Sequence, residues 1–331
     1  QLTLPCFTLS MAGLLLLYRY GRKILAFLLL LLLCNFAVVL FMTTDFISTN
    51  PDLHGYLLFS VFAFAFSSGL IIFLIMDGIR HSSFAIRHII LLSFGLLSIY
   101  PLLKHYPESD LSSNRIAADY GKSVLSDLDS NSILFADNVN LNFILRELQH
   151  AEGIRADVTI IDRGLLGFDW YVKQKRADQK VLFSDVPENW RGEKMFSRLL
   201  RKCMDLNRPV YMEFTERDSG LVNRLVPAGY VFRVSPSEIG LLSDNDLMLQ
   251  KKWDNSNLFN PQSEIFQKDW DAQRVFALSF YRLGLFYEWK GMISLALDQF
   301  SKVREVDPWN EEIILKTKHL ETIRMKSDSL S

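Results

Sequence analysis

The sequence lacks the residue patterns that define several common classes of protein. It has only three cysteines in 331 residues, two in apolar stretches (Cys6 and Cys34) and one alone on a predicted helix (Cys203), so no disulfide framework is expected. Its formal net charge is −1, so the chain lacks the excess of positive charge that is typical of nucleic-acid-binding proteins. No glycine-rich phosphate loop, paired-cysteine metal motif or Gly-x-Ser-x-Gly elbow occurs. We therefore expect no metal site, no cofactor and no nucleic-acid partner, with a divalent cation left open.

Acidic residues are scarce in the first hundred positions, where long apolar runs take their place. A run of about 20 apolar residues is long enough to cross the hydrocarbon core of a bilayer. A signal peptide fits less well, because there are several such runs and no cleavage-site pattern follows the first. For residues 1–104 the sequence predicts a membrane α-helical bundle of about four spans. The predicted spans are Leu2–Tyr18, Ile24–Thr44, Gly55–Met76 and Phe84–Leu103.

Basic residues predict the orientation of these segments. Arginine and lysine lie in the links between the first and second segments and between the third and fourth, whereas the loop Asp45–His54 has neither. The positive-inside rule then places this loop, and everything after Lys104, on the outer side of the membrane. The chain opens on Gln1 inside an apolar run, so we expect it to be the truncated C-terminal portion of a longer protein.

The stretch from Ser132 to Arg176 has a β–α–β–α pattern. The apolar run Ser132–Ala136 and the β-branched run Asp157–Ile161 predict strands, with a helix over Asn142–Ala151 between them. Strands joined in this way pair in parallel, and ligands bind beyond their carboxyl ends. Candidate substrate-binding residues at those ends are Asp137 and Asn138, a turn and N-cap pair, and Asp162. We expect loss of Asp137 to weaken the helix cap.

Further elements complete an α/β domain over residues 105–250. Val181–Phe183, Pro209–Phe214 and Tyr230–Val234 predict additional strands. Trp190–Leu206 predicts a basic amphipathic helix, whose cations either form a solvated face or contact lipid headgroups. The expected architecture is a small mixed or parallel sheet that begins with a Rossmann-like β–α–β unit and is covered by helices.

Residues 262–326 predict a terminal helical unit. Gly284 and Ala296 are small where two helices would cross closely, and Tyr287 and Phe300 are large enough to fill the space between them. This spacing resembles one tetratricopeptide repeat, which implies a possible protein or peptide partner.

The β–α–β–α stretch contains a set of residues with distinctive spacing. They are Ile133-Leu134-Phe135, Phe143, Glu152-Gly153-Ile154-Arg155, Asp157-Val158, Leu165-Leu166 and Asp169-Trp170-Tyr171. The set resembles the segment that follows the membrane part in bacterial proteins similar to protein O-mannosyltransferases, which belong with the C-type (GT-C) glycosyltransferases. The resemblance implies transfer of a sugar from a polyprenyl-phosphate donor to an exported protein or glycan. The α/β domain would assist acceptor binding.

Two residues of the α/β domain have two interpretations each. Trp170, on a predicted short helix Gly167–Arg176, either packs at the rim of the core or offers a platform for a sugar. Arg155 either bonds a carboxylate or loop carbonyls, with Asp157 fixing the turn before the strand, or holds the phosphate of the donor. Both are kept as candidate substrate-binding residues.

The predicted outer loop holds the catalytic candidates Asp45, Asp52, His54 and Tyr56. In C-type transferases a carboxylate at the outer face acts as general base on the acceptor hydroxyl. The same residues also fit an ordinary solvated turn around Asn50-Pro51-Asp52. The aspartate on which such enzymes most depend lies in an earlier outer loop, so we expect the catalytic base to be missing from this chain.

The sequence therefore predicts part of a multi-pass glycosyltransferase of the bacterial inner membrane, with its C-terminal domain on the periplasmic side. Its partners would be the lipid bilayer, a lipid-phosphate-linked sugar and a protein bound by the repeat. The alternative is a non-enzymatic, membrane-anchored interaction module that recruits a partner through the repeat.

Overall fold

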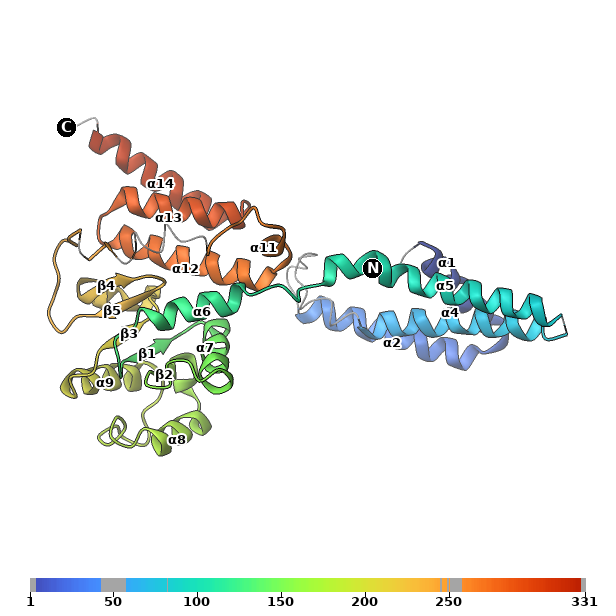
Figure 1. Ribbon diagram of the computed structural model, residues 1–331, viewed down its shortest axis with the longest axis horizontal. Helices are drawn as coiled ribbons and strands as arrows, with labels where there is room; N and C mark the ends of the chain where they lie inside the picture. Colours follow the sequence, from blue (N-terminus) through green and yellow to red (C-terminus); the bar gives the residue numbers. More distant parts are fainter. Residues whose placement is uncertain are drawn as a thin grey trace. The chain divides into compact units, whose positions relative to one another are not determined.

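The computed structural model describes residues 4–42, 58–81, 83–244, 246–248, 250 and 258–328. The chain divides into two compact units, Gln1–Ser113 and Asn114–Ser331 (Figure 1). Each unit has a hydrophobic cluster of its own, which in the first unit surrounds Leu17, Leu28 and Ala63.

The described part of the first unit is helical. Small residues let two of its helices, α1 and α4, approach closely, since a Cβ atom on Gly13 would collide with the carbonyl group of Ser67. Beside this contact, Ser10 Oγ donates to the carbonyl oxygen of Phe64 at 2.9 Å. The helices are α1 (Leu4–Tyr20), α2 (Arg22–Met42), α4 (Leu58–Gly78) and α5 (Phe84–Ser109).

The predicted fold class of a four-span membrane bundle in residues 1–104 is wrong. Within the described ranges, no helix combines the length and the apolar composition needed to cross a membrane. The fourth predicted span, Phe84–Leu103, lies in α5, whose apolar residues are interrupted by Arg87 and His88 and followed by Lys104 and His105. In addition, α1 has only 17 residues, which at about 1.5 Å per residue is shorter than a hydrocarbon core of roughly 30 Å.

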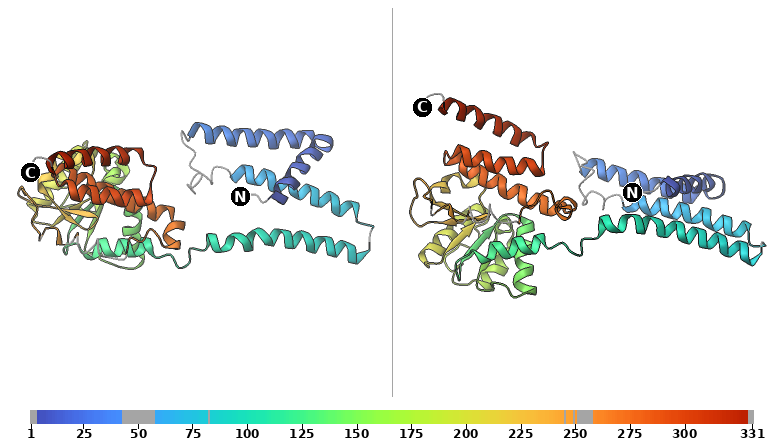
Figure 2. Two further views of the ribbon diagram at one scale, coloured as in Figure 1. Left: turned by 90° about the horizontal axis from the view of Figure 1, so that it is seen from above. Right: turned by 45° about the horizontal axis from the view of Figure 1, so that its top comes forward.

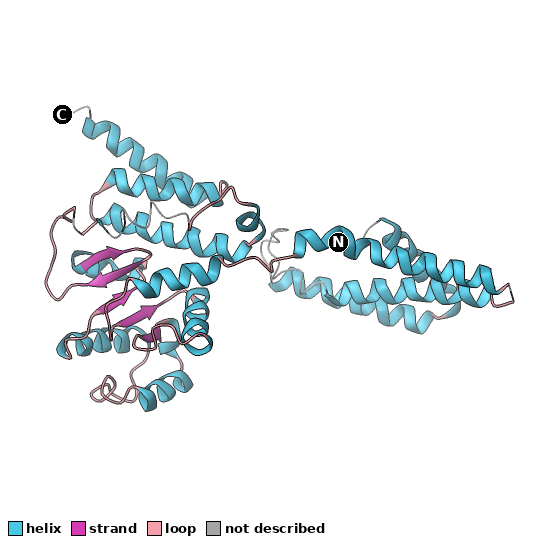
Figure 3. Ribbon diagram, viewed as in Figure 1, coloured by secondary structure: helices cyan, strands magenta, loops and turns pink. Residues whose placement is uncertain are grey.

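The second unit is built on a mixed five-stranded sheet with the strand order β2-β1-β3-β5-β4 (Figure 3). β1 pairs in parallel with β2 and β3, and β5 pairs antiparallel with β3 and β4. As predicted, one helix, α7 (Val139–Ala151), joins the parallel strands β1 and β2. The strands are β1 (Ile133–Ala136), β2 (Thr159–Asp162), β3 (Val210–Met212), β4 (Leu225–Ala228) and β5 (Val231–Val234).

Two of the strand predictions differ from this sheet. Val181–Phe183 lies in turns rather than a strand, because Leu182 and Phe183 reach the core from a turn and both become buried. The edge strand β4 was not predicted. Its sequence, Leu-Val-Pro-Ala, contains Pro227, and proline usually argues against a strand except at a sheet edge.

Helices pack around the sheet through aromatic contacts and one close approach. α9 places Phe196 edge-on to Phe135 of β1, with ring centroids 5.1 Å apart. α6 lies tightly on α7, since a Cβ atom on Gly121 would collide with Ile144. The helical segments of this region are α6 (Ile116–Ser126), η1 (Gly164–Gly167), α8 (Asp169–Asp178), α9 (Gly192–Asp205) and η2 (Glu216–Arg224).

Three long helices follow α11 (Glu264–Lys268) at the end of the chain: α12 (Trp270–Trp289), α13 (Ile293–Val306) and α14 (Glu311–Asp328). They lie side by side (Figure 2). A Cβ atom on Gly284 would collide with the ring of Phe300, so the close crossing predicted between the first two helices is confirmed. α12 also packs on the sheet, with the rings of Phe286 and Phe232 4.8 Å apart. Assignment of these helices to a tetratricopeptide repeat stays a prediction.

Candidate functional site

Three carboxylates gather where the three parallel strands end. Asp137 follows β1, Asp162 is the last residue of β2, and Glu213 follows β3. Because the carboxyl ends of parallel strands meet at one edge of a sheet, the topology brings these residues to the same place. This carboxyl edge is the candidate site.

Glu213 is the centre of a buried ion-pair network at this edge. Its side chain is 3% exposed and pairs with Arg282 of α12. Its Oε2 also accepts the backbone N–H groups of Asp137 and Asn138, at 2.6 Å each. Arg282 reaches Asp137 Oδ2 at 3.4 Å, and Arg217 lies 2.8 Å from Asp137 Oδ1. The network therefore ties α12 to the ends of β1 and β3.

A second buried pair stands beside the first. Arg163, directly after β2, makes a bidentate contact with Asp218 at 2.8 and 2.9 Å, and its guanidinium lies 3.9 Å from the ring centroid of Phe196. Burial lowers the pKa of Arg163, but the hydrogen bonds and charge of Asp218 outweigh burial and raise it overall. Asp218 also accepts from the N–H and hydroxyl of Thr215, both at 2.8 Å. All these charges are held by neighbours in the fold.

Asp162 stands in a different environment, without a close cation bonded to it among the described residues. Its Oδ1 accepts the N–H of Leu165 at 3.0 Å, and burial raises the pKa of its carboxyl group. The neighbouring Tyr171 hydroxyl accepts the N–H of Asp162 at 2.7 Å, and burial raises the pKa of Tyr171 to about 12. Burial also lowers the pKa of Lys175, whose Nζ donates to the carbonyl of Ile160 at 3.2 Å.

The sequence-predicted substrate residues separate into two groups. Asp137, Asn138 and Asp162 meet at the carboxyl edge, and Trp170 lies on α8 with 58% exposure, edge-on to Tyr171. Arg155 lies before β2, at the opposite end of the sheet. There it donates to the carbonyl oxygens of Leu125, Leu128 and Asp129 at 2.5, 2.9 and 3.0 Å, respectively. The catalytic candidates Asp45, Asp52, His54 and Tyr56 lie outside the described residues.

Arg155 makes the contacts that its structural interpretation predicts. It bonds Asp157 and three loop carbonyls, and Asp157 Oδ2 accepts the N–H of Asn131 at 2.9 Å. The cap predicted for Asp137 is wrong, because the N-cap of α7 is Asn138, whose side chain accepts the N–H of Asn140. Asp137 instead faces arginines.

Sequence reasoning missed Glu213 and Arg282. Glu213 lies in the predicted strand Pro209–Phe214 and Arg282 in the predicted helical unit of residues 262–326, and neither was a candidate site residue. A single charge inside each apolar run was the available signal, since a buried charge needs a partner. Nothing in the sequence identified the two as partners, because they are 69 positions apart.

A cavity of about 320 Å³ opens beside this network, between the start of α7 and the last three helices. Its walls combine polar and apolar side chains, and the polar ones are three asparagines, one arginine, one tyrosine and one glutamate. These are Asn138, Asn140, Asn310, Arg274, Tyr281 and Glu312, with Val139, Ala277, Leu278, Val303 and Ile313 as the apolar part. Amide groups both donate and accept, so this polar cavity can hold a ligand that carries several hydrogen-bonding groups.

Apart from Asp162, the carboxylates of this edge are engaged in ion pairs. The carboxylates of Asp137, Glu213 and Asp218 all accept from arginine. No group of three His, Cys, Asp or Glu side chains able to hold a metal ion occurs in the described ranges. The chemistry that this edge offers is recognition of a polar ligand.

A comparison with known protein families matches the part of the chain that supplies Asp137 and Asp162 to this edge. The family described as TMEM260-associated domain 2 matches residues 117–198, from α6 into α9. The chain is also similar to a mouse protein, Protein O-mannosyl-transferase TMEM260, with 25% identity over 87 residues. That alignment covers 26% of this chain and 12% of the mouse protein. No solved structure matches the chain. Over about a quarter of its length, this chain thus has an O-mannosyltransferase-like relative.

Proposed function

We propose that this chain is part of a glycosyltransferase-like protein and that its second unit helps to bind the acceptor. The observation that carries the proposal is the match of residues 117–198 to a domain associated with a protein O-mannosyl-transferase. By the name of that relative, the transferred sugar is mannose and the acceptor is a protein hydroxyl. The donor, a sugar on a polyprenyl phosphate, is taken from the family resemblance.

The geometry supports a binding role for this unit. The matched residues supply Asn138 and Asn140 to the polar cavity, whereas α12 and α14 supply Arg274, Tyr281 and Glu312. The buried pair of Glu213 and Arg282 fixes the two sides relative to each other. A cavity with several polar groups beside the carboxyl edge of a sheet suits a site that positions a substrate.

The test is deletion of the gene that encodes this sequence, followed by mass spectrometry of hexoses on the exported proteins of the host. We expect a defined set of proteins to lose hexose, and reintroduction of the intact gene to restore it. An unchanged hexose profile in the deletion strain would overturn the proposal.

A further inference from the structure

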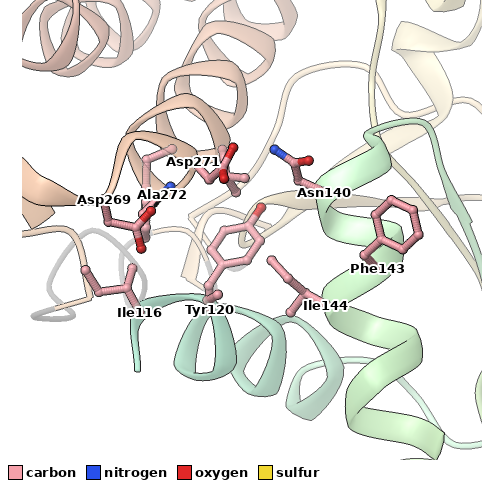
Figure 4. A pocket seen from close by; sticks show the side chains of 11 residues that line it. Ile116, Tyr120, Asn140, Phe143, Ile144, Asp269, Asp271 and Ala272 are labelled. Atoms are coloured by element: carbon pink, nitrogen blue, oxygen red, sulfur yellow. Dashed lines mark hydrogen bonds between the residues drawn. The ribbon is translucent and has the colours of Figure 1, made fainter. Parts of the chain in front are cut away.

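A second cavity, of about 310 Å³, lies between α6, α7 and α12. Figure 4 shows the ring of Tyr120 at its centre, Ile116 and Ile144 on either side, and Asn140 and Asp271 beyond the hydroxyl. Its lining is largely apolar, in contrast to the polar cavity at the carboxyl edge. This apolar cavity has the volume to accept one large side chain of a ligand.

The floor of the apolar cavity is preformed. The Tyr120 ring stacks on Tyr230 with centroids 5.1 Å apart and meets the edge of Phe276 at 5.3 Å. The Tyr120 hydroxyl lies 3.0 Å from Ser279 Oγ, so its polar group already has a partner. A ligand entering here therefore meets an ordered aromatic surface and needs no rearrangement of the core.

One residue joins the two cavities. Asn140, in the first turn of α7, lines both of them. Its side-chain amide forms no hydrogen bond to any residue that the structure describes. An amide at this position can bond both the N–H and the carbonyl of an extended chain that runs from one cavity to the other.

Arg274 gives the polar cavity an available positive charge. Its guanidinium lies 4.4 Å from the ring centroid of Trp270, and it makes no ion pair within the described part of the chain. The nearby Glu312 accepts from the Tyr281 hydroxyl at 2.6 Å. An exposed arginine held against an indole is well placed to receive a carboxylate.

We propose that the two cavities together bind an extended polypeptide that carries a large apolar side chain followed by an acidic residue. The apolar side chain enters the cavity over Tyr120, the main chain bonds Asn140, and the acidic side chain pairs with Arg274. This inference rests on the proposed function in one respect, since it takes the polypeptide to be a segment of the acceptor. The largely apolar lining over Tyr120 selects a side chain rather than a sugar, which needs hydrogen-bonding groups on most sides.

The experiment measures binding of fluorescein-labelled Gly/Ser peptides to the full 331-residue chain by fluorescence anisotropy. Each peptide carries one Phe and one Glu, and the spacing between the two is varied. Matched peptides replace Phe by Ala or Glu by Lys. We expect one spacing to bind best, with the Phe-to-Ala peptide at least about tenfold weaker and the Glu-to-Lys peptide about fivefold weaker.

Two variants test the two cavities separately. Ala117→Phe fills the apolar cavity from an exposed position of α6, and should weaken the best peptide at least about tenfold. Arg274→Glu should weaken it about fivefold and remove the preference for Glu over Lys. The controls Ala151→Phe and Arg304→Glu place the same changes at exposed helical positions outside both cavities, and should bind as the wild type does.

Equal binding of all peptides, or equal binding by Ala117→Phe and Ala151→Phe, would overturn the inference. The gene deletion tests the proposed function independently of the peptide-binding experiment. If deletion removes hexose while the peptides show no discrimination, the two-cavity site is wrong and the glycosyltransferase-like role stands. If the chain binds the peptides with different affinities while deletion leaves hexose unchanged, the glycosyltransferase-like role is wrong and the two-cavity site stands.

Discussion

Both ends of the sheet carry an arginine paired with a carboxylate, but in different surroundings. At the carboxyl end the side chains of Arg282 and Glu213 are 9% and 3% exposed, whereas at the amino end those of Arg155 and Asp157 are 24% and 40% exposed. A buried pair costs desolvation energy that its contacts must offset, while an exposed pair costs and contributes little. The desolvation cost of a buried ion pair is thus found at the carboxyl end of the sheet. The polar cavity lies at the same end.

The largest effect is expected for Arg282→Met. The change leaves the buried Glu213 carboxylate without its cation, so the free energy of unfolding should fall by about 3–5 kcal/mol. Urea unfolding of the full chain measures the loss. The double variant with Glu213→Gln should regain part of it, because the buried charge is then absent. A loss no larger than that of an exposed pair would show that the two ends of the sheet are alike.

A smaller effect is expected at the amino end for Arg155→Lys. Lysine keeps the charge but loses the planar fork that bonds the carbonyls of Leu125, Leu128 and Asp129. The free energy of unfolding should fall by about 1–2 kcal/mol. Thermal unfolding measures it, with Arg233→Lys as the control at an exposed pair. Equal melting temperatures for wild type and Arg155→Lys would contradict the structural role of this arginine.

Asn138→Ala tests the helix cap at the carboxyl end. The change removes the side-chain acceptor for the N–H of Asn140, so the free energy of unfolding should fall by about 1 kcal/mol. Asn138→Asp keeps an acceptor and should cost only a fraction of that in urea unfolding. If the aspartate and alanine variants are equally destabilised, Asn138 acts through something other than its cap.

The smallest effect is expected for Asp162→Asn and depends on pH. Burial raises the pKa of Asp162, so the stability linked to its protonated form is complete below the ordinary aspartate pKa of about 4 and is lost as pH rises through the raised value. The asparagine variant keeps an acceptor for Leu165 N–H and has no carboxyl group to ionise, so its stability does not fall in this way as pH rises. Its stability relative to wild type should therefore increase from about pH 4 to about pH 7 in urea unfolding. A pH-independent difference would contradict a raised pKa.

Local pattern and long-range pairing account for what could and could not be predicted. The β–α–β unit was predictable, because the residues from Ser132 to Ile161 alternate strand, helix and strand periodicity within one short stretch. The contact between Gly284 and Phe300 was predictable for the same reason. Glu213 and Arg282 were not, since the pairing of two distant charges depends on tertiary structure that no local pattern records.

The helical first unit shows a different kind of error. The prediction took apolar runs alone as evidence for spans, although α1 has only 17 residues and α5 carries basic residues near both of its ends. Composition reports how hydrophobic a segment is, whereas a span requires a helix of sufficient length in the same place.

Pro227 in the edge strand β4 has a consequence for how other chains can attach. An incoming strand extends a sheet by pairing its main chain with a continuous row of N–H and C=O groups, and proline interrupts that row because it has no N–H. Pairing of a partner's strand with β4 is thereby disfavoured. Such pairing uses main-chain groups and depends little on the partner's sequence. At that edge, the same residue opposes self-association of this chain into extended sheets.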